Sequence, residues 1–345
     1  MVKPIVRKIQ LTGGSTYIIS LPKTWVKQYL LQPGDEIEIF QDRHARLILV
    51  PKKSESNEKK EKKISLNCDR PDISFVIREI IAYYMAGFTL LTVSCSKFSS
   101  EDRERIKETI RNRLLGAEII DEDSNSLTIQ FLVSEKELSL TKSIIRAANI
   151  SYNMLRDSFK ALYDGNSDLS KEIISRDDDV DRFYFYIVRQ LSLSIEYPEI
   201  IENEKYNLTQ LVNLYSVAKS IERVSDHSLR IVDQLPILVK LEEKEIYEHG
   251  NEVADFFKSS INAFNEKDKD ISHNIINKEF ELLYKNRSLA EKVLNLNYSP
   301  KKTSSLLIIL DSIRRVIRYS IDIAEATIDL LAKQTEQDEE LDNLI

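Results

Sequence analysis

Residues 155–164 read LRDSFKALYD, and residues 257–266 read FKSSINAFNE, with apolar or small residues at corresponding positions. The two stretches lie 102 residues apart, and residues 220–224 align further downstream with residues 312–316 at a separation of 92. Each copy contains three helical segments, and the simplest packing of such a unit is a three-helix bundle. We therefore predict two bundles in tandem, although unrelated helices also share some apolar positions by chance.

A helical pattern with few interruptions surrounds both copies, from residue 136 to residue 335. Gly occurs there at positions 165 and 250, and Pro at positions 198, 236 and 300. These breakers and the polar loops between them separate six long helices. We expect the helices at residues 137–163, 166–196, 207–234, 241–265, 268–296 and 301–334, with the first repeat over 137–235 and the second over 240–334.

Upstream of the bundles, residues 64–135 alternate between helix and strand patterns. Residues 71–86 place apolar side chains on one helical face, and residues 88–93 read as a strand. A second helix is expected within residues 99–115, followed by a hairpin around residues 123–126. We predict a small α/β domain here, without a cluster of catalytic residue types.

Residues 1–53 read as short strands and turns around one short helix. Residues 2–9 and 16–21 are rich in β-branched side chains, and residues 36–40 alternate polar with apolar. A segment of about 50 residues is marginal as an independent fold, so we expect a second copy to complete its core. Residues 54–63 contain no apolar residue and read as a solvated linker, or alternatively as a helical extension of exposed charge.

The amino-acid composition of the chain excludes several classes of protein. The 345 residues include 7 Gly and 8 Pro, which argues against a many-stranded β fold and against Gly-rich phosphate loops. The 2 Cys are too few for a disulfide framework or a four-cysteine metal site and are compatible with a reducing cytosol. No stretch is long and apolar enough to span a bilayer, and the N-terminus has no signal-peptide pattern, so we expect a soluble, cytoplasmic protein.

Charge is distributed unevenly along the chain. Residues 1–63 hold 13 Lys and Arg against 7 Asp and Glu, a net charge of +6, whereas the rest of the chain carries a net charge of −13. A basic N-terminal segment on an acidic body indicates that this segment contacts a polyanion and that the body has a different task.

Two pairs of acidic residues stand out in the first repeat. Asp177 and Asp181 are four residues apart on its second helix, and Glu222 and Asp226 are four residues apart on its third. Each pair shares a helix face, so the four carboxylates can meet at one place. Carboxylate-only sites favour hard or borderline cations such as Mg, Mn or Fe, which makes these residues candidate metal ligands. The alternative is a solvated acidic face. The second repeat lacks the pattern and has, at the corresponding positions, Glu279, Leu283, Arg314 and Arg318.

The N-terminal segment resembles the AbrB-like (SpoVT-AbrB) swapped-hairpin domain at Gly14-Ser15, Leu21–Val26, Pro33–Ile37 and Leu47–Pro51. Residues 137–335 resemble the PhoU family, in which Asp or Glu followed four residues later by Asp recurs on two helices of each half. The whole chain is similar to an archaeal fusion of these two parts. The resemblance implies a multidomain α+β protein with a small swapped-hairpin β head, a small α/β middle domain and C-terminal all-α tandem three-helix bundles.

The PhoU resemblance implies metal binding by the first repeat. Its motif falls on Asp177, Asp181, Glu222 and Asp226, and the candidate ions are divalent or ferric: Fe, Mn, Mg or Zn. The second repeat departs from the motif, which argues against a second cluster.

The AbrB resemblance implies a homodimer that binds DNA. The basic residues expected to neutralise DNA phosphates are Lys3, Arg7, Lys8, Lys23 and Lys27. Heads of this type can also serve only for dimerisation. Together, the two resemblances imply a DNA-binding transcriptional regulator of phosphate uptake and phosphate signalling, with a helical sensor body.

Three alternatives stay open at this point. The chain could be an adaptor that regulates a phosphate transporter through contact with an ABC transporter ATPase or a signalling protein. It could be a structural adaptor without a bound ion, or a carboxylate-metal hydrolase or oxidase. The first repeat lacks the paired Glu-x-x-His motifs of di-iron enzymes, and the common nucleotide-binding and hydrolase motifs do not occur, so we do not expect an enzyme.

Overall fold

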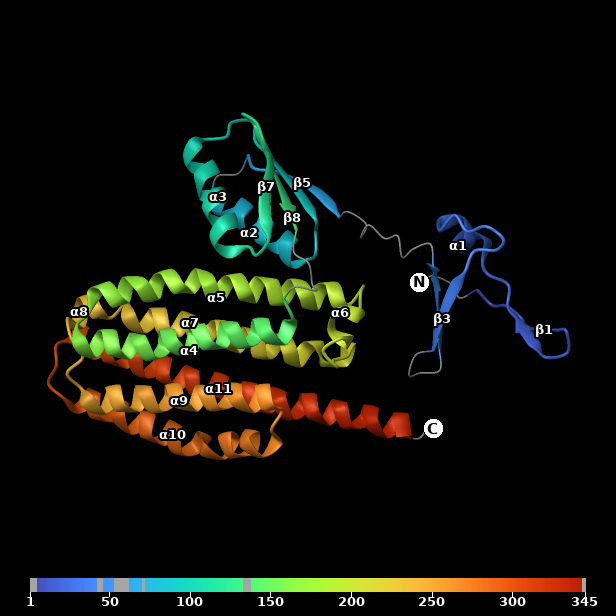
Figure 1. The fold of residues 1–345 in the computed structure, drawn as a ribbon. Helices are drawn as coiled ribbons and strands as arrows, with labels where there is room; N and C mark the ends of the chain where they lie inside the picture. Colours follow the sequence, from blue (N-terminus) through green and yellow to red (C-terminus); the bar gives the residue numbers. More distant parts are fainter. Residues whose placement is uncertain (1–4, 42–45, 53–61, 70–71, 133–137, 343–345) are drawn as a thin grey trace. The chain divides into compact units, whose positions relative to one another are not determined.

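The computed structural model describes residues 5–41, 46–52, 62–69, 72–132 and 138–342, without the side chains of residues 40, 41 and 333–342. It divides into two compact units, Met1–Glu61 and Lys62–Ile345, which we call the head and the body (Figure 1). Most of the predicted linker, residues 54–61, lies outside the described residues, as does Lys3.

The described residues of the head form two antiparallel hairpins and a short helix. Its elements are β1 (Gln10–Thr12), β2 (Thr16–Ile18), α1 (Lys23–Gln28), β3 (Ile37–Gln41) and β4 (Leu47–Pro51), with β1 paired to β2 and β3 paired to β4. Gly13 and Gly14 form the first turn with positive φ angles of 62° and 81°, which Gly adopts without steric strain. The predicted strand over residues 2–9 is wrong for its described part, because residues 5–9 have no strand partner among the residues that the structure describes.

The body begins with an α/β layer that follows the predicted order of elements. Its elements are β5 (Lys63–Asn67), α2 (Ile73–Met85), β6 (Leu90–Ser94), α3 (Ser100–Arg113), β7 (Ala117–Glu122) and β8 (Ser126–Phe131). The sheet order is β5-β6-β8-β7, with β5 parallel to β6 and the other pairs antiparallel. Val76 and Ile80 of α2 are fully buried, as are Leu127 and Ile129 on one face of β8. The alternation along β8 therefore gives the sheet one apolar face for the helices.

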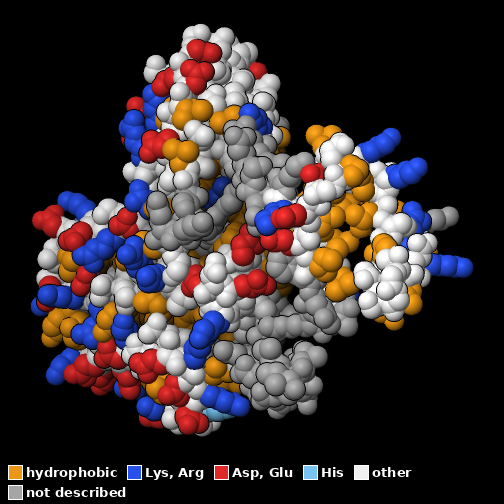
Figure 2. Space-filling model, turned by 45° about the vertical axis from the view of Figure 1, so that its right-hand side comes forward, with side chains coloured by type: hydrophobic (Ala, Val, Ile, Leu, Met, Phe, Trp, Pro, Cys, Tyr) orange, Lys and Arg blue, Asp and Glu red, His pale blue; other side chains and the backbone are white. Residues whose placement is uncertain are grey.

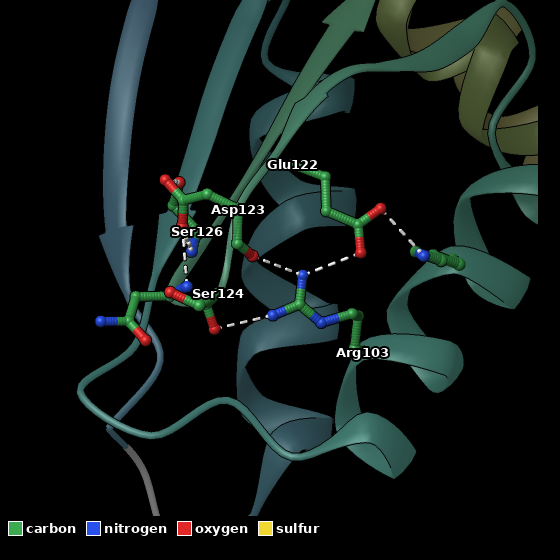
Figure 3. A network of polar contacts seen from close by, with 7 residues as sticks. Arg103, Glu122, Asp123, Ser124 and Ser126 are labelled. Carbon is green, nitrogen blue, oxygen red and sulfur yellow. Dashed lines mark hydrogen bonds and ion pairs between the residues drawn. The ribbon is translucent and has the colours of Figure 1, made fainter.

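Arg103 of α3 contacts the hairpin between β7 and β8 (Figure 3), and Nζ of Lys107 on the same helix lies 2.9 Å from the carboxylate of Glu122. Arg103 donates hydrogen bonds to the carboxylate of Glu122 at 2.8 Å and to the carbonyl oxygens of Asp123 and Ser124 at 2.8 and 2.9 Å. The carboxylate of Asp123 accepts a hydrogen bond from the backbone N–H of Ser126 at 2.7 Å, which is the local turn chemistry typical of Asp. The turn expected from the sequence is thus fixed both locally and by the neighbouring helix.

In contrast to the reduced thiols expected in a reducing cytosol, a disulfide joins Cys68 and Cys95, which directly follow the parallel strands β5 and β6. The backbone N–H of Cys68 also donates to the carbonyl oxygen of Ser94 at 2.9 Å. The disulfide and this hydrogen bond together hold the carboxyl ends of the two strands next to each other.

In the described part of the body that follows the α/β layer, six long helices are present, as the sequence predicts. They are α4 (Leu140–Asp164), α5 (Ser167–Ser194), α7 (Leu211–Val232), α9 (Lys244–Glu266), α10 (Lys269–Asn295) and α11 (Pro300–Asp342). Short helical turns α6 (Glu199–Glu202), η2 (Leu208–Gln210) and α8 (Leu235–Leu238) lie between them. Helices α4, α5 and α7 pack together, as do α9, α10 and α11 (Figure 1). The fold class inferred from the sequence, short β hairpins, a small α/β region and C-terminal helical bundles, is confirmed.

The α/β layer packs on α5 of the first bundle. Arg189 of α5 is 3% exposed and donates to the carbonyl oxygens of Tyr84 and Phe88 at 2.6 and 2.8 Å. Gly87 has a φ of +86°, and a Cβ added there would lie 2.6 Å from Cδ2 of Leu193 on α5. Gly is therefore required at this position both by the backbone angle and by the close approach of α5.

Among the helices that the structure describes, none has the length and apolar character needed to cross a membrane.

Candidate functional site

The four acidic candidates lie on two neighbouring helices of the first bundle. Asp177 and Asp181 belong to α5, and Glu222 and Asp226 belong to α7, which packs against α5. Burial raises the pKa of Asp177 to about 7, and the negative charges of Asp181 and Asp226 add to the rise. The carboxylates of the two helices are thus close enough to repel one another.

Asp226 shows the same effect from the other helix. Burial, followed by the charges of Glu222 and Asp181, raises its pKa to about 6. A pair of close carboxylates in a partly buried place binds protons or cations more readily than exposed acids do. These four residues, which we call the acidic cluster, therefore attract positive charge.

Two basic side chains already neutralise part of the acidic cluster. Arg113, in the last turn of α3, donates to the carboxylate of Asp181, and its Nε lies 3.5 Å from the carboxylate of Asp178. Nζ of Lys219 lies 2.7 Å from the carboxylate of Glu222. Burial raises the pKa of Asp181, and the charge of Arg113 opposes that rise.

The carboxylate oxygens of the acidic cluster are donors that a hard cation prefers, but their present arrangement is not that of a metal site. Oδ1 of Asp177 and Oε2 of Glu222 are buried and accept no hydrogen bond from the described residues, which leaves two carboxylate oxygens for a ligand. Within the described part of the chain, however, no three Asp, Glu, His or Cys side chains converge closely enough to hold one ion. His227 follows Asp226 but faces away, with its ring centroid 5.8 Å from that of Tyr319 on α11.

The corresponding place in the second bundle contains its own counterion. Arg318 of α11 forms an ion pair with Glu279 of α10, and Arg314 forms one with Asp311 at 2.7 Å. The arginines that replace the acids thus offset the charges of Glu279 and Asp311, whereas burial and neighbouring acidic charges still raise the pKa values of Asp322 and Glu325 on α11.

The described basic candidates of the head are exposed. Arg7 and Lys8 precede β1, and Lys23 and Lys27 are four residues apart on α1, so these two lysines share one helix face. All four side chains reach solvent, where they can contact phosphates; Lys3 lies outside the described residues.

Sequence reasoning found the carboxylates but missed their basic partners. Arg113 lies more than sixty positions upstream of Asp181, in another element, and no local pattern links the two. Lys219, by contrast, lies three residues before Glu222, so a helical-spacing argument could have identified that pair.

Known families match two separate parts of the chain. Residues 144–235, from α4 to the end of the first bundle, match the family described as PhoU domain, and residues 10–57 match "Antidote-toxin recognition MazE, bacterial antitoxin", an AbrB-like domain. The acidic cluster lies within the first match, and Lys23 and Lys27 lie within the second. The predicted resemblance is thus supported at the level of these two domains.

A curated relative and two solved structures extend this comparison. The "Phosphate-specific transport system accessory protein PhoU homolog" of Clostridium acetobutylicum is 30% identical over 111 residues, which are 32% of this chain and 48% of that protein, so the match spans about half of the relative's length. The crystal structure of the phosphate transport system regulatory protein PhoU from Streptococcus pneumoniae has a TM-score of 0.50 at 17% identity, covering 55% of this chain and 92% of that one. This likeness supports a PhoU-like fold for the C-terminal helical region of the body. PhoU from Pseudomonas aeruginosa aligns with a TM-score of 0.41 at 15% identity, over 56% of this chain and 96% of that one.

Proposed function

We propose that this protein is a cytoplasmic, DNA-binding regulator of phosphate uptake and phosphate signalling, and that it acts by binding rather than catalysis. The observation that carries the proposal is the union, in one chain, of an AbrB-like head with exposed basic residues and a PhoU domain that contains an acidic cluster. The head supplies contact with a polyanion, and the body supplies a place where inorganic ions alter the charge balance.

A homodimer formed through the head is part of the proposal. The described side chains of the head leave large apolar groups in solvent, with Val6 81%, Leu30 79% and Tyr17 75% exposed. Figure 2 shows hydrophobic side chains gathered on the head, with Lys and Arg side chains projecting beside them. A monomeric soluble unit rarely exposes so much apolar surface, and a second head with the same surface would cover it.

An electrophoretic mobility shift with DNA from upstream of the protein's own gene tests the proposal. We expect a shift at low salt and a loss of at least tenfold in affinity for the double variant Lys23→Gln/Lys27→Gln, because two phosphate contacts per protomer disappear. The matched control is Lys278→Gln/Lys301→Gln, which makes the same change in net charge at exposed positions of the body. A folded dimer that shifts no DNA at low salt contradicts the DNA-binding part.

The second candidate is an adaptor that regulates a phosphate transporter by protein contact. The name of the clostridial relative, an accessory protein of a phosphate-specific transport system, favours this role. In that case the head only dimerises, and the body binds a transporter ATPase or a signalling protein. Retention of such an ATPase by the full-length protein, without any DNA shift, distinguishes the adaptor from the regulator.

We also propose that the acidic cluster binds a divalent or ferric cation. Its carboxylates repel one another, and two of their buried oxygens have no hydrogen-bond partner among the described residues. A bound cation supplies positive charge between α5 and α7 and removes this repulsion. Arg113 and Lys219 supply part of the same charge without an ion.

The variant Asp177→Asn tests the ion through thermal unfolding. The folded-state pKa of Asp177, about 7, lies above its ordinary value, so ionisation of this carboxyl destabilises the fold as pH rises from about 4 to about 7. In chelator-treated protein we expect equal melting temperatures at pH 4 and a more stable variant at pH 8, by roughly 1–2 kcal/mol after allowance for solvent screening.

If the cluster binds the ion, addition of Mn²⁺ at pH 8 makes the wild type more stable than Asp177→Asn, because only the wild type retains all four carboxylates. Asp179→Asn, an exposed carboxylate on the same helix, serves as the control and changes neither result. Equal stabilisation of the wild type and Asp177→Asn by Mn²⁺ contradicts the metal site.

A further inference from the structure

An open cleft of about 750 Å³ lies where α2 and α3 of the α/β layer meet α5 of the bundle. Its size is in the range of about 300–1,000 Å³ that is usual for small-molecule sites. The cleft is separate from the acidic cluster but borders it, because Arg113 and Asp178 contribute to its wall.

Three arginines and the carboxylates of Glu108 and Asp178 line the cleft, and Asp72 adds a further negative charge near Arg78 and Arg105. Neither Arg78 nor Arg105 forms an ion pair within the described part of the chain, and both are exposed. Nη2 of Arg105 donates to Oγ of Ser74 at 3.2 Å, and this bond holds the guanidinium across the gap between α3 and α2. Guanidinium groups bind phosphate oxygens with two parallel hydrogen bonds.

Arg113 adds a third guanidinium to the wall of the cleft. Its Nε is buried and lies 3.5 Å from the carboxylate of Asp178, an ion-pair contact without a hydrogen bond, and its guanidinium carbon lies 5.4 Å from the ring centroid of Phe185. A phosphate oxygen closer to this N–H would give it the hydrogen bond that buried donors usually make.

The wall of the cleft formed by α2 is apolar, and this limits the class of ligand. Ile77, Ile81 and Met85 project from α2 at helical spacing, and Ile77 and Met85 are only partly buried. An inorganic anion would leave this apolar surface uncovered. A ligand with both a phosphate group and a flat apolar part covers the two kinds of wall at once.

We propose that this cleft binds a nucleoside phosphate, with Arg78 and Arg105 on the phosphate and the base against the apolar wall of α2. Because Arg113 contacts the acidic cluster on one side and the cleft on the other, the ligand and Asp181 compete for the same guanidinium. Binding in the cleft therefore changes the charge balance between α5 and α7.

Isothermal titration of the full-length protein with adenosine and guanosine mono- and diphosphates, inorganic phosphate and adenosine tests the proposal. We expect saturable binding of at least one nucleotide, at least tenfold tighter than that of phosphate or adenosine alone. Equal affinity for phosphate and for the nucleotides contradicts the role of the apolar wall, and no binding of any nucleotide overturns the proposal.

Two arginine variants locate the site. Arg105→Gln and Arg78→Gln, both at exposed positions, should each weaken nucleotide binding at least tenfold. Arg111→Gln, an exposed arginine of the same helix outside the cleft, should leave the affinity unchanged. Unaltered affinity in both cleft variants places the nucleotide elsewhere and overturns the assignment.

Asp181→Asn tests the competition for Arg113. The amide binds the guanidinium less strongly than the carboxylate does, so we expect nucleotide affinity to rise severalfold. Unchanged or weaker affinity in a variant that melts like the wild type contradicts the sharing of Arg113.

Discussion

Raising the salt concentration from about 50 to 200 mM should weaken DNA binding by about 10³–10⁵-fold. Each chain offers five basic candidates in the head, so a homodimer presents ten of them to the DNA backbone. Neutralising about 6–10 phosphates releases as many condensed counterions, and the logarithm of the affinity then falls with the logarithm of the salt concentration at a slope of about −5 to −9. Fluorescence anisotropy of labelled DNA at several salt concentrations measures this slope.

The variant Lys23→Gln provides the internal control for that slope. A dimer loses two phosphate contacts, so the slope should become shallower by about 2. A slope near zero, or one that Lys23→Gln leaves unchanged, shows that these residues do not contact the backbone and favours a head that serves only for dimerisation.

Gly87→Ala should lower the free energy of unfolding by about 3 kcal/mol, since it adds backbone strain of about 1–3 kcal/mol and overpacking of similar size. The φ of +86° disfavours any residue with a Cβ, and the new methyl group would lie 2.6 Å from Cδ2 of Leu193. Chemical denaturation followed by circular dichroism measures this loss of unfolding free energy. We expect the contact between α2 and α5 to be the first part of the structure to weaken.

A double-mutant cycle with Leu193→Ala separates the clash from the backbone strain. Removing the leucine side chain leaves room for the new methyl group. The loss of stability in the double variant should therefore be smaller than the sum of the two single losses, by at least about 1 kcal/mol. Strict additivity contradicts the close approach of α5 to Gly87.

The order of the secondary structure elements was largely predictable from the sequence. Helical periodicity and rare breakers define the six long helices, and Asp123 with its polar neighbours marks the hairpin of the α/β layer. Local patterns suffice for these elements because each depends on residues only a few positions apart. The strand predicted over residues 2–9 failed over its described part because a strand needs a partner, and composition alone does not provide one.

The candidate sites were predictable only where they follow helical spacing. Asp177 with Asp181 and Glu222 with Asp226 are visible as acid pairs four residues apart. The contact of Arg113 with Asp181 depends on how α3 packs against α5, and no period in the sequence encodes that packing. The cleft between α2, α3 and α5 is invisible from the sequence for the same reason.

The ion pair between Arg318 and Glu279 distinguishes the second bundle from the first only in part. Both bundles contain in-chain counterions, and both contain carboxyls whose pKa values burial and acidic neighbours raise, Asp177 and Asp226 in the first and Asp322 and Glu325 in the second. Because the pKa of Asp177 is about 7, a fraction of the chains carries a proton between α5 and α7 near neutral pH. Mild acidification therefore titrates the interior of the first bundle and not only the surface of the protein.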